Sequence, residues 1–260
     1  MKRSVFILSL ISLALIFSCT EEKKKGNQKT SKDLTIKVDT LTFNDTTPLY
    51  EGANVGLNMR MHIEWPEDAV SEEALKNMQR NITCLLFDKD LSTTDIEFAM
   101  KAYNRKSSEL YIEVNEGEYN DFEEDSYMTD WEVFIEGSFM KPYGDLISYQ
   151  KYTSGYSGGA HGLDALSYIT FDRKTGNVIS DSELFKEGYQ DRLIESLRAN
   201  LLFSVEDTDM LFELDILPSE NFYLNEKGIT YIYQRYEIGP YYLGIIKVTI
   251  PWKEIQDILK

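Results

Sequence analysis

Histidine, cysteine and proline are scarce in this sequence, and their scarcity excludes several kinds of site. Among its 260 residues there are 2 histidines, 2 cysteines and 6 prolines. His62, His161, Cys19 and Cys84 stand in unrelated parts of the chain, so they give none of the ligand spacings of a zinc site. Phosphate-loop and dinucleotide-binding motifs are also missing. We therefore expect neither a metal nor a cofactor.

Basic residues are few relative to acidic ones. The 27 lysines and arginines against 44 acidic residues give a net charge of −17 at pH 7. This charge disfavours nucleic acid and anionic lipid surfaces as partners and favours cationic ones, although solubility is the simpler explanation. No lysine or arginine occurs between Ser107 and Met140, where acidic and aromatic residues are interleaved. This stretch is either a solvated sheet edge and loop or an acidic face for a basic partner. The ligand pattern of a calcium-binding EF-hand is missing from it.

A hydrophobic run long enough to span a membrane is missing as well. Val5 to Phe17 is apolar over roughly 13 residues, short of the ~20 that a spanning helix needs, and it follows Lys2 and Arg3. It is typical of an export signal. The Ser18-Cys19 pair after it resembles a lipoprotein signal, which predicts a signal peptide at 1–18, an acylated Cys19 and a polar tether at 19–33. A secreted protein with an incidental cysteine is the alternative.

Export and lipidation together predict a location in the cell envelope. Because Thr20, and not aspartate, follows Cys19, the resemblance implies transfer to the outer membrane, on its periplasmic or its surface face. Acylation of Cys19 would leave Cys84 alone, so we expect no disulfide. Cleavage after Ser18 would also remove two basic residues and leave a net charge of −19.

The remaining 225 or so residues favour an α+β fold. Apolar patterning predicts strands at 34–43, 55–65, 109–115, 130–140, 146–152, 165–172 and 245–250, and a hairpin at 222–233. Pro66 is expected to end the second strand. Capping patterns predict helices that begin at Ser71, at the Ser92–Asp95 capping box, at Gln190 and at Pro251. Because helices and strands do not alternate strictly, we predict an antiparallel or mixed sheet with helices packed on one face. Two halves, 34–145 and 146–260, are expected to form one compact unit.

Glycine is concentrated between Lys151 and Gly162, in the segment Lys-Tyr-Thr-Ser-Gly-Tyr-Ser-Gly-Gly-Ala-His-Gly. Such density marks backbone that needs a positive φ or that another group approaches closely, so we predict a special loop between two strands. Ser157 and His161 lie four residues apart in it, which raises the hypothesis of a nucleophile and its base. A strand, and not a helix, is predicted to follow, which departs from the usual setting of a nucleophilic serine.

The segment Tyr156-Ser-Gly-Gly-Ala-His-Gly162 resembles the signature of an uncharacterised extracytoplasmic domain family. The blocks Phe222 to Gly228, Tyr236 to Tyr241 and Val248 to Trp252 resemble it too. This family is shared by the C-terminal part of the RsiV anti-sigma factor and the non-catalytic part of the PdaC peptidoglycan deacetylase. The resemblance implies an RsiV-like domain at 146–260 and binding of lysozyme, as in the anti-sigma relative. It implies no deacetylase activity, because that activity resides in a separate domain.

The sequence therefore predicts a lipid-anchored binding module of the cell envelope, and not an enzyme. The expected ligand is a cationic muramidase of the lysozyme type; a cell-wall glycan or peptidoglycan is the alternative, and a hydrolase that uses Ser157 and His161 is a further one. The binding candidates come from the glycine loop and from a tyrosine-rich turn: Tyr156, Ser157, Gly158, Gly159, His161, Gly162, Tyr236 and Tyr241. The tyrosine turn has a second interpretation, in which it packs beneath the loop and stabilises the sheet.

Overall fold

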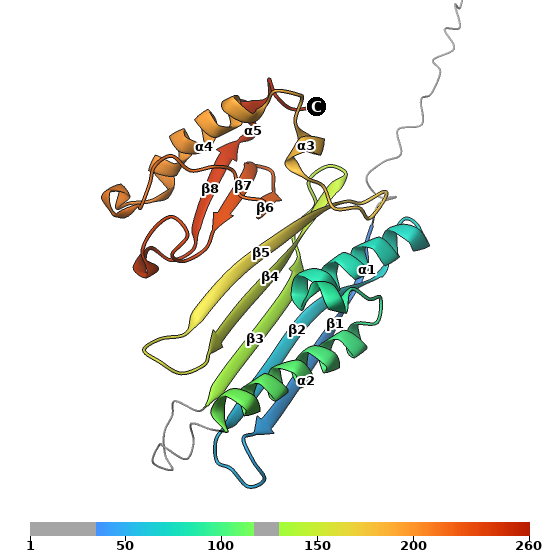
Figure 1. The fold of residues 1–260 in the computed structure, drawn as a ribbon. Coiled ribbons are helices and arrows are strands. Elements are labelled where there is room, and N and C mark those ends of the chain that lie inside the picture. Colours follow the sequence, from blue (N-terminus) through green and yellow to red (C-terminus); the bar gives the residue numbers. More distant parts are fainter. Residues whose placement is uncertain (1–34, 117–129) are drawn as a thin grey trace, which may run out of the picture. The chain divides into compact units, whose positions relative to one another are not determined.

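The structure, a computed structural model, describes residues 35–116 and 130–260 (Figure 1). The predicted signal peptide, Cys19 and the tether lie outside the described residues, as does the centre of the acidic stretch, 117–129. The lipid anchor therefore stays a prediction. In the part of the chain that is described, no helix has both the length and the apolarity to cross a membrane.

A five-stranded mixed sheet forms the larger part of the fold. Its strands are β1 (Lys37–Pro48), β2 (Gly56–Asp68), β3 (Trp131–Phe139), β4 (Leu146–Tyr156) and β5 (Leu163–Asp172), in that spatial order. Only β2 and β3 are parallel, and their long connection carries α1 (Glu72–Leu86), the short turn η2 (Lys89–Leu91) and α2 (Ile96–Asn115). Both long helices lie against one face of this sheet, as Figure 1 shows. The predicted α+β class, with helices on one face of a mixed sheet, is confirmed.

Period-two and helical apolar patterns meet in the core of this layer. Strand β2 turns Leu57, Met59, Met61 and Ile63 inward, each 2% exposed or less, because alternate side chains share one face of a strand. The stripe of α1 that covers them includes Met78, which is fully buried. Ser71 begins this helix as predicted, since its hydroxyl accepts a hydrogen bond from the amide of residue 74 at 3.1 Å.

Three predictions of local structure were wrong. Residues 109–115 are not a strand but the last two turns of α2, in which Leu110 and Val114 are exposed while Tyr111 is fully buried. The apolar residues of this stretch therefore belong to a helix, of which one side is buried and the other carries two exposed apolar residues.

Pro66 does not end β2, which runs on to Asp68. The helix expected to start with the Ser92–Asp95 pattern begins only after it, at Ile96. Asp95 is its N-cap, and its carboxylate accepts a hydrogen bond from the amide of residue 98 at 2.9 Å. The terminal helix is a single turn.

A second, three-stranded antiparallel sheet follows. It consists of β6 (Phe222–Leu224), β7 (Gly228–Tyr233) and β8 (Ile246–Pro251), so the predicted hairpin and last strand are confirmed. The remaining helical elements are α3 (Asp181–Leu184), α4 (Gln190–Ser204), η5 (Thr208–Met210), η6 (Tyr241–Leu243) and α5 (Trp252–Ile255). Leu193, Leu197 and Leu201 of α4 are fully buried in a second core against this sheet.

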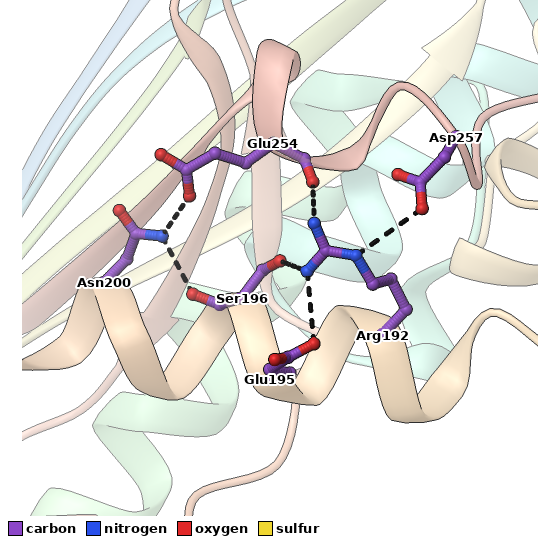
Figure 2. Close-up of polar contacts among 6 residues, drawn as sticks. All are labelled: Arg192, Glu195, Ser196, Asn200, Glu254 and Asp257. Atoms are coloured by element: carbon purple, nitrogen blue, oxygen red, sulfur yellow. Dashed lines mark hydrogen bonds and ion pairs between the residues drawn. The ribbon is translucent and has the colours of Figure 1, made fainter.

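A polar network joins α4 to α5 (Figure 2). The guanidinium of Arg192 donates to the Ser196 hydroxyl at 2.7 Å and to the backbone carbonyl of Glu254 at 2.5 Å, and it lies 3.5 Å from a carboxylate oxygen of Asp257. Asn200 donates to the Glu254 carboxylate at 2.9 Å. A single helical turn leaves most of its backbone carbonyls without an intrahelical donor. Arg192 therefore supplies a donor to the Glu254 carbonyl that α5 itself cannot provide.

Two amide side chains close the outer edge of β5. Gln234 accepts a hydrogen bond from the backbone amide of Leu166 at 3.2 Å and donates to its carbonyl at 2.6 Å. Asn221 accepts from the amide of Tyr168 at 2.8 Å and donates to the Leu166 carbonyl at 2.8 Å. A side-chain amide presents the same donor and acceptor as a peptide group, so both residues occupy positions that a sixth strand would use. Strand β4 pairs with β3, so the five-stranded sheet extends across the predicted division at residue 145.

Candidate functional site

The glycine-rich segment is the β4–β5 hairpin tip, Ser157–Gly162, and it is shorter than predicted. β4 continues to Tyr156 and not only to residue 152, so residues 153–156 are paired strand and not loop. Gly158 and Gly159 have φ values of 90° and 87°, a conformation that side chains with a Cβ rarely adopt. No heavy atom lies within 4 Å of where a Cβ on Gly159 would stand, so backbone conformation, and not crowding, requires glycine at that position.

The exposed tip is braced from both of its ends. The Tyr156 hydroxyl donates to the Gly159 carbonyl at 2.9 Å, which ties the loop to its own entry strand. The Tyr241 hydroxyl donates to the Gly162 carbonyl at 3.1 Å, from a turn 79 residues later in the chain. The ring of His161 stacks on Tyr241 with centroids 4.1 Å apart and an interplanar angle of 26°. The predicted loop and the predicted tyrosine turn are therefore in direct contact.

Arg235 links the hairpin to the tyrosine turn, and its role was not predicted from the sequence. Its Nε is ion-paired with the carboxylate of Asp164, with side chains only 22% and 25% exposed. Its Nη1 donates to the Tyr241 carbonyl at 2.8 Å, and its guanidinium carbon lies 4.5 Å from the centroid of the Tyr241 ring. The hydrogen bond with Asp164 raises the pKa of the Arg235 guanidinium. Arg235 is the one basic residue between Lys227 and Lys247, and that isolation beside a tyrosine cluster was an available signal.

Tyr236 is the most accessible of the predicted tyrosines. It is 54% exposed, and its ring centroid lies 5.7 Å from that of Tyr241. Its φ of 66° is the one positive value at a non-glycine residue in the described part of the chain. Left-handed backbone at a bulky residue costs about 1–3 kcal/mol and persists where the surrounding contacts hold it. The contacts of the neighbouring Arg235 with Asp164 and Tyr241 stabilise this backbone conformation.

Two hollows adjoin the hairpin tip on the sheet. One has a volume of about 450 Å³; aromatic and aliphatic residues dominate its walls, among them Trp131, Val133, Tyr156, Leu163 and Tyr236. Another, of about 340 Å³, is more polar and shares Tyr156 with the first. Its other walls include Arg60, Glu132, Gly162 and Tyr241. The tip therefore stands beside concave surface with both apolar and charged walls. Trp131 in this cleft was not predicted, because only the folded sheet brings it to the tip.

Ser157 and His161 are both exposed and are not hydrogen-bonded to each other in the described structure. The Nδ1 of His161 lies 3.2 Å from the carbonyl oxygen of Gly162, and its ring rests on Tyr241. General-base activation of a serine needs hydrogen-bond distance between the two side chains, directly or through one water. Within the described residues, no group of three or more histidine, cysteine or acidic side chains is placed to hold a metal ion.

The arrangement offers recognition of a partner surface and of a small ligand in the adjoining cleft. It brings together all eight predicted binding residues, seven of which lie in or directly beside the tip or stack on it. The eighth, Tyr236, reaches the tip through its contact with Tyr241. These contacts join the β4–β5 hairpin to the turn between β7 and β8, so the geometry depends on both parts of the fold.

Comparisons with known proteins give a family match over part of the chain and a shared fold. Residues 182–253 match the family model described as "Protein of unknown function (DUF3298)". A solved structure of a DUF3298 family member from Bacteroides fragilis NCTC 9343 is similar, with a TM-score of 0.78 and 21% identity over 88% of this chain and 95% of that chain. A DUF3298 family protein from Pseudomonas aeruginosa PAO1 gives a TM-score of 0.63 and 17% identity over 88% of this chain and 96% of that chain. None of the curated proteins compared matches the chain. At these identities the solved structures establish the fold alone.

Proposed function

We propose that this chain is a lipid-anchored binding module of the cell envelope and that the β4–β5 hairpin tip contacts its partner. The observation that carries the proposal is the combination of exposure and bracing at the tip. Ser157 and His161 are exposed, while hydrogen bonds from Tyr156 and Tyr241 hold the loop backbone. A loop that is already ordered loses little conformational entropy on binding, so such a loop is a favourable contact surface.

The most concrete partner is a cationic muramidase of the lysozyme type. The net charge of −17, or −19 after loss of the signal, would steer a strongly basic enzyme toward this domain. Glu132, exposed on β3, stands near the tip and supplies local negative charge. The resemblance to the lysozyme-binding part of an anti-sigma factor supports the same partner. A narrow hairpin tip suits insertion into the concave substrate cleft of such an enzyme.

The proposed role is recognition and not catalysis. His161 is engaged with Tyr241 and faces the carbonyl of Gly162, and no contact joins it to Ser157 in the described residues. Direct measurement of esterase and peptidoglycan-hydrolase activity in the intact chain tests this part. Turnover that disappears in both Ser157→Ala and His161→Ala would establish the hydrolase alternative.

The envelope location depends on Cys19. Metabolic labelling with palmitate and partition into detergent should both be lost in Cys19→Ala, because acylation requires its thiol. Cys84→Ala is the matched control, since it removes the other cysteine and leaves the signal intact. Labelling that survives in Cys19→Ala would contradict the anchor.

Calorimetric titration with hen-type lysozyme tests the partner. A soluble form beginning at Leu34 should bind with submicromolar affinity at about 0.15 M salt, where non-specific charge attraction is strongly screened. Ala160→Arg places a bulky cation on the exposed tip and should abolish binding, whereas Val70→Arg adds the same charge far along the chain and should not. Binding that fades as salt rises, or that both variants weaken equally, would reduce the interaction to net charge.

A cell-wall saccharide is the second candidate, favoured by the cleft of about 450 Å³ beside the tip. Trp131, Tyr156 and Tyr236 in its walls provide aromatic faces of the kind on which sugar rings stack. Titration with soluble peptidoglycan fragments, monitored by tryptophan fluorescence, distinguishes this ligand. Saturable binding lost in Tyr236→Ala but kept in Ala160→Arg would favour the saccharide over the enzyme.

A further inference from the structure

The C-terminal end of α4 and the segment after it expose an unusual number of large apolar side chains. Phe203 is 89% exposed, Leu217 62% and Phe212 61%. We call the whole set the α4-end patch: Leu202, Phe203, Met210, Phe212, Leu214 and Leu217. Single exposed apolar residues are ordinary on protein surfaces, but a cluster of them marks an interaction site. These six lie within 16 consecutive residues of the chain.

The segment that carries the patch is fixed in place by its other side chains. Val205 and Ile216 are buried in the core beneath α4, 9% and 2% exposed. The amide of Phe212 donates to the carbonyl of Ile238 at 3.0 Å, which attaches the segment to the tyrosine turn. Two buried side chains and one backbone hydrogen bond therefore fix the segment that carries the exposed apolar residues.

One ion pair and one hydrogen bond bring the far end of the segment back to α4. Arg198 of α4 pairs with the carboxylate of Asp215, and its Nε donates to the carbonyl of Ile216 at 3.4 Å. Leu202 follows Arg198 by one helical turn on the same side of α4, so the return of the segment places Leu214 and Leu217 beside that side. Leu202, Leu214 and Leu217 therefore share one part of the surface, and the other three residues lie between them in the chain.

Carboxylates are interleaved with these apolar residues, and the segment itself carries no basic residue; Arg198 of α4 offsets the charge of Asp215 alone. Glu206, Asp207, Asp209, Glu213 and Asp215 lie between Phe203 and Leu217. No lysine or arginine occurs between Arg198 and Lys227. A partner must therefore offer apolar side chains surrounded by positive charge. An anionic lipid surface and a second copy of this acidic chain both carry the wrong charge.

We propose that the α4-end patch docks a basic amphipathic helix of a partner protein. The partner's apolar stripe would cover Phe203, Phe212 and their neighbours, and its lysines or arginines would pair with the surrounding carboxylates. The inference does not depend on the hairpin tip or on a muramidase, since none of its residues belongs to that site.

The probe is a synthetic 18-residue helical peptide of leucine and lysine, labelled and titrated with the intact chain at about 0.15 M salt. Two control peptides have the same length: one has glutamate in place of lysine, and the other has serine in place of leucine. Only the leucine–lysine peptide should bind. Phe203→Ser combined with Phe212→Ser should weaken binding at least tenfold, because both substitutions remove apolar area that the peptide would bury.

Phe98→Ser is the control variant, since Phe98 is 58% exposed on α2, far from the patch in sequence. Circular dichroism should show all variants folded, because the changed side chains are exposed. Equal weakening by Phe98→Ser, or equal binding of the lysine–serine peptide, would overturn the proposal. So would association with anionic vesicles, or self-association of the chain, that disappears in the double variant while peptide binding is unchanged.

Discussion

Replacing Asp181 by asparagine should stabilise the protein near neutral pH and remove a pH dependence. Asp181 is the first residue of α3, and its carboxylate accepts a hydrogen bond from the buried Tyr231 hydroxyl at 3.3 Å. Burial raises the pKa of Asp181 to about 6, the Tyr231 hydrogen bond opposes that rise, and the nearby charge of Glu220 adds to it. The folded protein therefore binds this proton more tightly than the unfolded chain does.

The sign and size of the effect follow from the raised pKa. A carboxyl group with a pKa of about 3.9 when unfolded and about 6 when folded stabilises the fold fully below pH 3.9. That contribution is lost as pH rises through about 6, where the buried carboxylate becomes charged. About two pKa units correspond to roughly 2–3 kcal/mol. Asparagine is neutral throughout and keeps an oxygen that accepts from Tyr231.

Urea denaturation of the wild type and of Asp181→Asn between about pH 4 and pH 8 measures the effect. The variant should exceed the wild type by about 2–3 kcal/mol at pH 7.5, and the two should converge near pH 4. Subtraction of the two curves removes the contribution of every other carboxylate. Glu187→Gln is the control, because Glu187 is exposed, and it should show no pH-dependent difference from the wild type. A difference for Asp181→Asn that is constant across the pH range would refute the argument.

Three further substitutions test the packing and the helix ends by urea denaturation. Gly137→Ala should lose about 2–4 kcal/mol, because the new Cβ would lie 2.2 Å from the hydroxyl of the fully buried Tyr149, and an unchanged midpoint would contradict that contact. Arg192→Ala should lose about 1–2 kcal/mol through the α4–α5 network of Figure 2; Arg192→Lys should recover little, since a lysine cannot form the forked set of bonds. Ser71→Ala should cost about 1 kcal/mol at the start of α1, whereas Ser71→Thr should be nearly neutral; equal losses would show that the hydroxyl does not cap.

The sequence was most informative where one pattern had a single interpretation. The α4 stripe and the short β6–β7 hairpin were predicted because leucine spacing and turn residues agreed with each other. Residues 109–115 were mispredicted because Leu110, Ile112 and Val114 alternate, although α2 continues through them with Leu110 and Val114 exposed. Local alternation cannot reveal which side of a long helix faces solvent. Only the packing of Tyr111 against the sheet decides it.

The candidate site divides in the same way. Glycine density and tyrosine clustering predicted the tip and the turn that contacts it, because such residues have few ordinary uses together. The bond from Tyr241 to Gly162 could not be predicted, since it joins positions 79 residues apart. Arg235 and Trp131 were missed because their importance comes from neighbours supplied by other strands.

The amide groups of Asn221 and Gln234 have a consequence for assembly. They bond the backbone amide and carbonyl of Leu166 and the backbone amide of Tyr168 at the outer edge of β5. An open strand edge is a template on which another chain can add its own strand. Leucine at either amide position would reopen that template while leaving the two cores in place. The damage would then depend on protein concentration: dilute samples would lose only the stability of those hydrogen bonds, and concentrated ones would precipitate from the folded state.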